Sequence, residues 1–158
     1  MLAWKETPLG AQISLLHVRR SILIQATPAE VWREFESFDR IAAWLSRGHV
    51  LHVLEPKLGG LVEMSVEIDG ERRHYGGRML VWEPERELTF DNNWAPPHAW
   101  PVPMFWTIRL TPLYDGTQVE LFHHGFERLG AEAADLLEGF EEGWDVKHLK
   151  ALRSIVEH

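Results

Sequence analysis

The chain contains no cysteine, no long apolar run and no large basic cluster, and each absence excludes a class of protein. Without cysteine there is no disulfide, no thiol nucleophile, no iron–sulfur cluster and no zinc site that needs thiolate ligands. No apolar stretch approaches the roughly 20 residues of a membrane helix. The N-terminus has no apolar segment behind a basic start, so we expect no signal peptide. These features predict a cytoplasmic protein without a membrane span.

The charge balance is acidic, with 24 Asp and Glu against 16 Lys and Arg and a formal net charge of −8. No basic cluster exceeds the pairs Arg19–Arg20 and Arg72–Arg73, which disfavours a nucleic-acid partner. The 158 residues are 45% hydrophobic and include eight tryptophans, so the chain can bury a sizeable core. This length favours a single domain over residues 1–158.

The first part of the chain predicts a strand followed by two short helices. Alternation of apolar and polar residues predicts a strand within 14–26. Thr27 then provides a helix cap, Pro28 suits the first helical position and Glu30 completes a capping box. A second short helix is expected near 41–45, with Gly48 ending it.

From Gly48 to about His124 the apolar period changes to two, which is typical of half-buried antiparallel strands. In the clearest example Val62, Met64 and Val66 share one face. Asp69–Gly70 and Asp115–Gly116 are the hairpin-turn signals. Strands are expected at 61–68, 72–83, 86–94, 104–111 and 117–124. Helices after the first strand and then a run of strands indicate an α+β fold.

The last element is predicted to be one amphipathic helix over about 131–157 that lies across the apolar face of the sheet. Gly139 and Gly143 would each cost about 1 kcal/mol there relative to alanine. Close approach of the helix backbone to the sheet or to a partner is the favoured explanation, and a bend that shapes a cavity is the alternative.

Several short motifs, in this order and spacing, resemble the START-like (SRPBCC) superfamily and most closely its Hsp90-ATPase-activator-homologue (AHSA1-like) group. They include TPAEVW at 27–32, Trp44, Gly59–Gly60, Asp69–Gly70, GRMLVWEPEREL at 77–88, Asp115–Gly116–Thr117 and Gly143–Trp144. The sequence departs from the group at Leu45, which replaces the second residue of a usual Trp-Trp pair, and in the Pro- and Trp-rich segment 91–104.

The resemblance implies a helix-grip (Bet v 1-like) fold, in which a curved antiparallel sheet wraps around a long C-terminal helix. Two short helices follow the first strand and close one end. In such proteins the space between sheet and helix is commonly a cavity for an apolar ligand. The superfamily includes lipid carriers, polyketide cyclases and plant hormone binders, so the fold alone does not fix the function.

We therefore expect non-covalent binding of a small hydrophobic or aromatic ligand between the sheet and the last helix. His123 and His148 would orient the ligand, although His123 could equally be a satisfied core residue and His148 a boundary residue at the edge of the stripe. The apolar walls would come from Met64, Val66, Trp106, Val119, Leu121, Phe140 and Trp144.

Two other histidine patterns carry no such signal. His49-x-x-His52 and His123–His124 lie on strands, where neighbours and i, i+3 residues face opposite sides. No third ligand accompanies His123 and His148, so we expect no metal site and no cofactor. In the segment 91–104, Trp94 and Trp100 could cover a pocket, form a homodimer contact or simply hold the loop in place.

Two rival functions remain open. One is a polyketide cyclase- or aromatase-like enzyme that uses His123 as acid or base, which needs a second inward polar group. The other is an Hsp90-type co-chaperone, which we disfavour because the eukaryotic activators carry an additional N-terminal domain.

Overall fold

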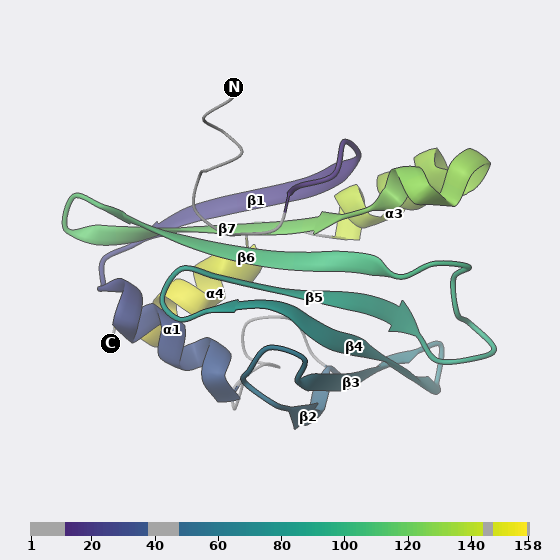
Figure 1. Ribbon diagram of the computed structural model, residues 1–158, viewed down its shortest axis with the longest axis horizontal. Coiled ribbons are helices and arrows are strands. Elements are labelled where there is room, and N and C mark those ends of the chain that lie inside the picture. The colour runs from purple at the N-terminus through teal and green to yellow at the C-terminus, as the bar shows by residue number, and fades with distance from the viewer. Residues whose placement is uncertain (1–11, 38–47, 144–146, 158) are drawn as a thin grey trace.

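The fold is built on one antiparallel sheet of seven strands (Figure 1). The structure is a computed structural model that describes residues 12–37, 48–143 and 147–157. In space the strands follow the order β1-β7-β6-β5-β4-β3-β2. They comprise β1 (His17–Ile24), β2 (Val50–Leu54), β3 (Leu61–Ile68), β4 (Glu71–Glu83), β5 (Glu87–Trp94), β6 (Met104–Leu113) and β7 (Gly116–His124). The predicted strands are thus confirmed, with ends shifted by a few residues, and β2 is added at one edge.

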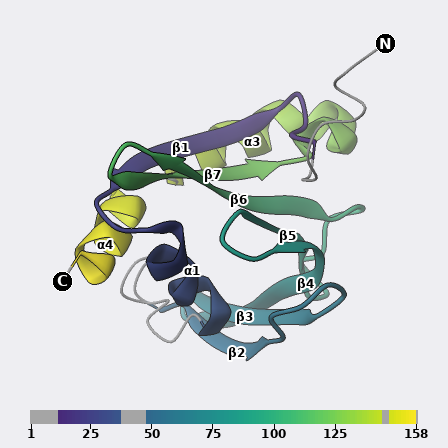
Figure 2. The same ribbon diagram turned by 60° about the vertical axis from the view of Figure 1, so that its left-hand side comes forward.

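The sheet is strongly curved, so that its two edges, β1 and β2, approach the same side of the molecule (Figure 2). Helix α1 (Pro28–Ser37) lies between them at one end, and the Thr27 hydroxyl accepts a hydrogen bond from the Glu30 amide, as the capping signal predicts. The second predicted short helix, near 41–45, lies outside the described residues.

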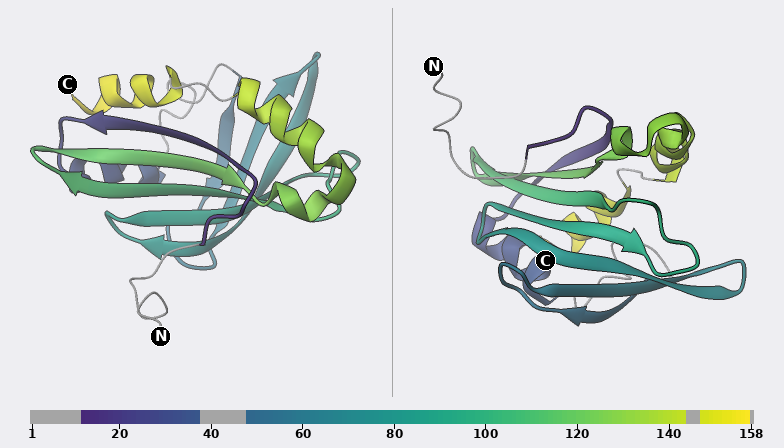
Figure 3. Two further views of the ribbon diagram at one scale, coloured as in Figure 1. Left: turned by 90° about the horizontal axis from the view of Figure 1, so that it is seen from above. Right: turned by 45° about the vertical axis from the view of Figure 1, so that its right-hand side comes forward.

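The C-terminal part forms η2 (Phe126–Glu132), α3 (Ala133–Gly143) and α4 (Lys147–Val156) where one helix was expected. Residues 144–146, including Trp144, lie outside the described residues. Figure 3 shows α3 and α4 running in different directions, and both contact β1. The first helical turns end at Gly130, whose φ of 64° is not helical. The close approach to the sheet expected at Gly139 is wrong, because no described residue outside the helix backbone lies within 4 Å of a Cβ built there, and approach to a partner stays a prediction.

Alternation along the strands creates an apolar concave face. Trp106, Ile108 and Leu110 are all buried, as predicted, and so are Val119 and Leu121. The helices cover this face with three side chains from α1 and two from α4: Val31, Trp32, Phe35, Leu149 and Leu152. Both the sheet and the terminal helices therefore contribute to one main core, which is the arrangement of a helix-grip fold.

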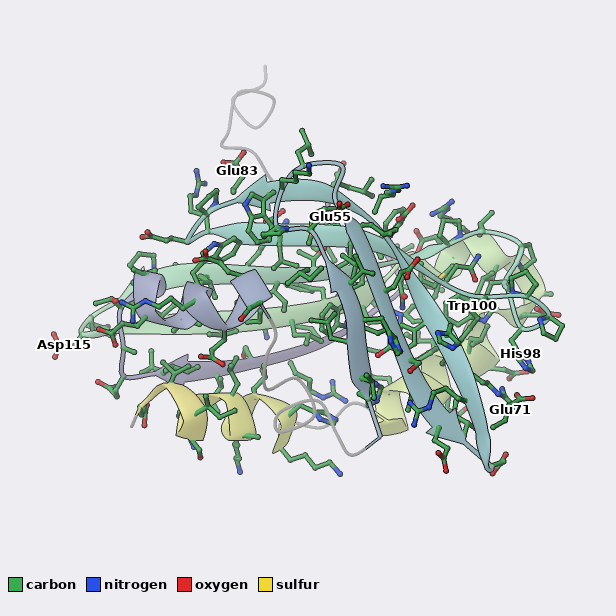
Figure 4. The ribbon with its side chains drawn as sticks, turned by 90° about the horizontal axis from the view of Figure 1, so that it is seen from below. Glu55, Glu71, Glu83, His98, Trp100 and Asp115 are labelled. Carbon is green, nitrogen blue, oxygen red and sulfur yellow. The ribbon has the colours of Figure 1, made fainter. Side chains whose placement is uncertain are left out.

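Strand β4 bends at two glycines. A Cβ at Gly76 would meet the Val62 carbonyl oxygen at 2.0 Å, and one at Gly77 would meet the Asp91 carbonyl oxygen at 1.9 Å. Only glycine permits this close approach of neighbouring strands. Beyond the bend, β2, β3 and β4 run steeply across the direction of the other strands (Figure 4).

The β6–β7 hairpin turns one residue earlier than predicted. Its central residues are Tyr114 and Asp115, with Tyr114 at a φ of 55°, and Gly116 already pairs with Leu113. Gly116 is required for a different reason, because a Cβ there would lie 2.4 Å from the Ile24 carbonyl oxygen.

These glycines allow a matched stability test. Gly139→Ala should raise the melting temperature by about 2–4 °C, since alanine favours an exposed helix by about 1 kcal/mol and meets no neighbour. Gly77→Ala should lower it by about 4 °C or more, since the backbone clash costs about 2 kcal/mol or more. Equal melting temperatures for both variants, measured by differential scanning calorimetry, would contradict this account of the bend.

Candidate functional site

Five of the predicted site residues share the concave face of the sheet. Met64, Trp106, Val119 and Leu121 belong to the main buried core, and Val66 is half-buried on the same side of β3 as Met64. The Trp106 ring packs edge-on against Phe90 at 5.0 Å. The predicted apolar walls are therefore largely filled by side-chain packing in the middle of the sheet.

His123 and Phe140 lie together in a second cluster, beneath α3. The His123 ring is 4.4 Å from the Phe140 ring and 5.0 Å from the Phe126 ring, measured between centroids. Burial, with a smaller contribution from His124, lowers the pKa of His123 to about 3. The imidazole is therefore neutral at physiological pH and a very weak base.

The segment 91–104 is held in place by this second cluster. The Trp100 ring packs between Trp94, at 6.3 Å, and Phe140, at 6.0 Å. The Asn93 amide accepts a hydrogen bond from the Trp100 backbone N–H and donates one to its carbonyl. In Figure 4 this loop carries His98 beside Glu71, with 3.0 Å between the His98 Nε2 and the Glu71 carboxylate. Within the described residues, Trp100 joins β5 to α3.

His124 faces the opposite side of the sheet, as alternation predicts. Its Nδ1 accepts a hydrogen bond from the Ser14 backbone N–H, which can only donate. Its Nε2 therefore carries the proton and donates to the Thr107 hydroxyl at 2.9 Å, and Thr107 lies 2.8 Å from the Thr89 hydroxyl. Burial and the neighbouring His17 lower the pKa of His124 to about 4. This chain is structural, since it ties the segment before β1 to β7.

A polar pair that sequence reasoning missed lies on the concave face beside Met64. The His49 Nδ1 is 2.7 Å from the Tyr75 hydroxyl, and the same hydroxyl is 3.6 Å from the Met64 sulfur. The Tyr75 ring packs edge-on against Trp94 at 5.3 Å. The single phenol proton can go either to the Met64 sulfur or to the imidazole. We assign it to the imidazole, because the thioether is the weaker and more distant acceptor, and this assignment leaves the His49 proton on Nε2.

The electrostatic setting keeps both members of this pair neutral. Burial raises the pKa of Tyr75 far above its ordinary value, so the phenol remains protonated. Burial also lowers the pKa of His49, and repulsion from His148 lowers it further. His148 is buried on α4, with 8% of its surface exposed, so it faces the same region as predicted instead of solvent. The site thus combines a phenol and two imidazoles with apolar walls.

A signal for Tyr75 exists in the sequence. In a hairpin with a two-residue turn at Asp69–Gly70, residues at equal distances before and after the turn face each other. Tyr75 therefore lies directly opposite Met64. His49 and His52 do not form a ligand pair, as expected from the sequence, because their rings face opposite sides of the sheet. His52 Nε2 lies 2.7 Å from the Ser65 hydroxyl on the outer face.

Next to the pair, a hollow of about 520 Å³ lies over strands β3, β4 and β5. It is lined by residues 61–63, 74–77 and 93–95, and these include Tyr75 and Trp94. Among the residues that the structure describes, no group of three His, Asp or Glu side chains could hold a metal ion. None of the helices in the described ranges is long and apolar enough to span a membrane.

A curved seven-stranded sheet whose apolar concave face receives the terminal helices defines a helix-grip protein. The family model described as "Activator of Hsp90 ATPase homolog 1-like protein" matches residues 25–157, and the chain belongs to this family. The resemblance noted from the sequence is thereby confirmed. None of the curated proteins compared with the chain matches it significantly.

Solved structures agree on the fold. Protein CV1439 from Chromobacterium violaceum is 26% identical, with a TM-score of 0.67 over 90% of this chain and 98% of that one. The Aha1 dimer from Colwellia psychrerythraea is 14% identical, with a TM-score of 0.65 over 90% of this chain and 97% of that one. DynU16, from the dynemicin biosynthetic locus, is 21% identical, with a TM-score of 0.62 over 90% of this chain but 47% of that one.

The two buried histidines predict acid lability. Unfolded histidines take up protons near pH 6.5, whereas folded His123 and His124 resist protonation until about pH 3 and 4. The free energy of unfolding should therefore fall as pH drops below about 6.5, by up to about 1.4 kcal/mol per pH unit for each histidine. Urea unfolding between pH 7 and 4 measures this slope.

His123→Leu should make the slope clearly shallower, because one titrating group is removed. As a control, Phe126→Leu removes an aromatic ring beside His123 but keeps the imidazole. This variant should have a lower free energy of unfolding at every pH, with the same dependence of that free energy on pH. An unchanged slope in His123→Leu would contradict the assignment of acid lability to this residue.

Proposed function

We propose that the protein binds a small hydrophobic or aromatic molecule without covalent chemistry, between the sheet and the C-terminal helices. The observation that carries the proposal is the His49–Tyr75 pair, a hydrogen-bonded polar group beside an otherwise apolar concave face. Ligand sites usually combine apolar walls with a few fixed polar groups that set orientation. Membership of a family whose fold commonly holds hydrophobic ligands supports the same conclusion.

In this proposal the apolar contacts come from the side of the face near the pair. Met64 touches the Tyr75 hydroxyl, Trp94 packs on the Tyr75 ring, and Val66 is half-buried one position further along β3 on the same side. We propose His49 for the orienting role that was expected of His123, and His148 keeps its proposed role. Trp144, which lies outside the described residues, remains a proposed wall residue.

An enzyme of the polyketide cyclase kind is the second candidate. The likeness to DynU16, from a biosynthetic locus, favours it, although at 21% identity that likeness concerns the fold alone. A cyclase that used His123 as a base is disfavoured, because its lowered pKa of about 3 makes it some four units too acidic for work at neutral pH. A cyclase version of this site would instead use the His49 imidazole and the Tyr75 phenol.

Protein partners are a separate matter. The family description names Hsp90 ATPase activation, and the Colwellia psychrerythraea relative is a dimer, so co-chaperone activity and homodimerisation both remain proposals for this chain. We place them below ligand binding, because the half-buried His49–Tyr75 pair lies on the concave face, where a protein-binding surface does not need it.

Neighbouring residues of β3 provide the test. Val66→Trp should fill space on the concave face and weaken binding of the neutral dye N-phenyl-1-naphthylamine about tenfold, or roughly 1.4 kcal/mol. Glu67→Trp adds the same side chain on the exposed opposite face and should leave the affinity within about twofold. Dye fluorescence titration measures both.

Native mass spectrometry of the purified protein should also detect a co-purifying small molecule. Absence of dye binding by the unaltered protein, together with a bare mass in the native spectrum, would overturn the proposal.

A further inference from the structure

The polar groups of the concave site share one property, which is that none of them carries a negative charge. His49, Tyr75 and His148 bring imidazole and phenol groups, and the other close contacts are Met64 and Trp94. Among the described residues, no carboxylate contributes to the electrostatic environment of His49. A half-buried group of this kind offers hydrogen-bond donors to a ligand and no repulsion to an anion.

One donor in this group has no hydrogen-bond partner among the residues that the structure describes. Tyr75 occupies the Nδ1 side of His49, and within the described part of the chain nothing binds the Nε2 side. Because the tyrosine proton fixes the tautomer, Nε2 carries a hydrogen and presents it to whatever enters the site. Such a donor selects for a ligand oxygen that accepts, such as a carbonyl or a carboxylate.

We propose that the ligand is a carboxylic acid with an apolar or aromatic body, whose carboxylate accepts a hydrogen bond from His49 Nε2 and whose binding draws a proton onto that imidazole. This inference rests on the proposed ligand-binding function and specifies its substrate class. The proton comes from solvent and binds to His49 Nδ1, the nitrogen that contacts Tyr75. The phenol hydroxyl then rotates, so that its oxygen accepts a hydrogen bond from Nδ1 instead of donating one.

The electrostatic environment of His49 explains why a proton would bind together with the ligand. Burial and the charge of a protonated His148 both work against a cationic His49, and the pKa of His49 is lowered accordingly. A carboxylate in contact with the ring supplies the opposite charge, which favours the imidazolium form. A charge-assisted hydrogen bond of this kind is about twice as strong as a neutral one.

Other charged groups nearby do not supply a competing site. Arg72 donates to the carbonyl of Gly48, the residue before His49, but it also binds the Ser65 hydroxyl and lies 3.5 Å from the Glu67 carboxylate. Lys147 precedes His148 on α4 and is exposed. A phosphate, which usually needs several such cations at once, fits this group less well than a single carboxylate does.

The test compares two probes of nearly the same shape, the anionic 1-naphthaleneacetic acid and its neutral amide, 1-naphthaleneacetamide. Isothermal titration calorimetry in phosphate and in Tris at pH 7 counts the protons exchanged, because the two buffers differ in ionisation heat. We expect the acid to bind about tenfold more tightly than the amide and to take up about half a proton or more per molecule bound. The amide should exchange none, and acid binding should strengthen between pH 8 and 6.

Two histidines of the same chain segment give the matched variants. His49→Gln keeps a partner for Tyr75 but cannot take up a proton, so it should weaken acid binding about tenfold, abolish proton uptake and weaken amide binding by a clearly smaller factor. His52→Gln lies three residues along on the outer face and should behave like the unaltered protein. Tyr75→Phe, which keeps the ring packing against Trp94, should also reduce proton uptake.

The outcomes separate this inference from the proposed function. Equal affinity for acid and amide without proton uptake would overturn the carboxylate inference and leave hydrophobic binding standing. Proton uptake that persists in His49→Gln would overturn the assignment to His49. Failure of both probes while N-phenyl-1-naphthylamine binds would also reject the acid ligand, and failure of all three would reject the proposed function itself.

Discussion

Antiparallel register is the constraint on which the rest of this structure depends. Each two-residue turn sets which residues face each other, and a slip of one position would turn every side chain to the other face. The turn at Asp69–Gly70 places Met64 opposite Tyr75, and that single pairing brings the phenol onto the apolar side. The turn at Tyr114–Asp115 places Trp106 opposite His123 in the same way.

The two faces of the sheet use buried polar groups differently. On the outer face, His124, Thr107 and Thr89 form a closed chain in which each group has a partner, and the result is mechanical attachment of the segment before β1. On the concave face, His49 and Tyr75 satisfy each other on one side of the imidazole, and no other described residue binds the second side. A fully satisfied network stiffens a fold, whereas a pair with a remaining donor can respond to a ligand.

Much of the fold follows from the sequence, because strands and helix starts are local properties. The alternation at 61–68 and the cap at Thr27 predict β3 and the start of α1 without knowledge of the rest of the chain. The site was harder to predict, since it depends on contacts between distant segments. His49 directly precedes β2, whose ends the sequence pattern does not predict. The position of its partner Tyr75 can be predicted only by counting strand pairs from the turn at Asp69–Gly70.

His123 was expected either to orient a ligand or to be a core residue, and its burial beside two aromatic rings agrees with the second alternative. As an inward residue after Val119 and Leu121 it has the pattern of a ligand-orienting group, and its face was predicted correctly. Its surroundings were not, because Phe126 and Phe140 come from elements whose position over the sheet cannot be read from periodicity. Hydropathy indicates which side a residue faces, but it does not indicate whether aromatic rings or open space will meet it there.

The pairing of β1 with β7 affects how the protein can fold during its synthesis on the ribosome. Residues 17–24 find their partners only in residues 117–124, so the first strand emerges about a hundred residues before the strand it needs. At translation speeds of about 5–20 residues per second, it waits roughly 5–20 s as an unpaired segment. The nascent chain must therefore keep this strand soluble or shielded by a chaperone until residues 117–124 have been made.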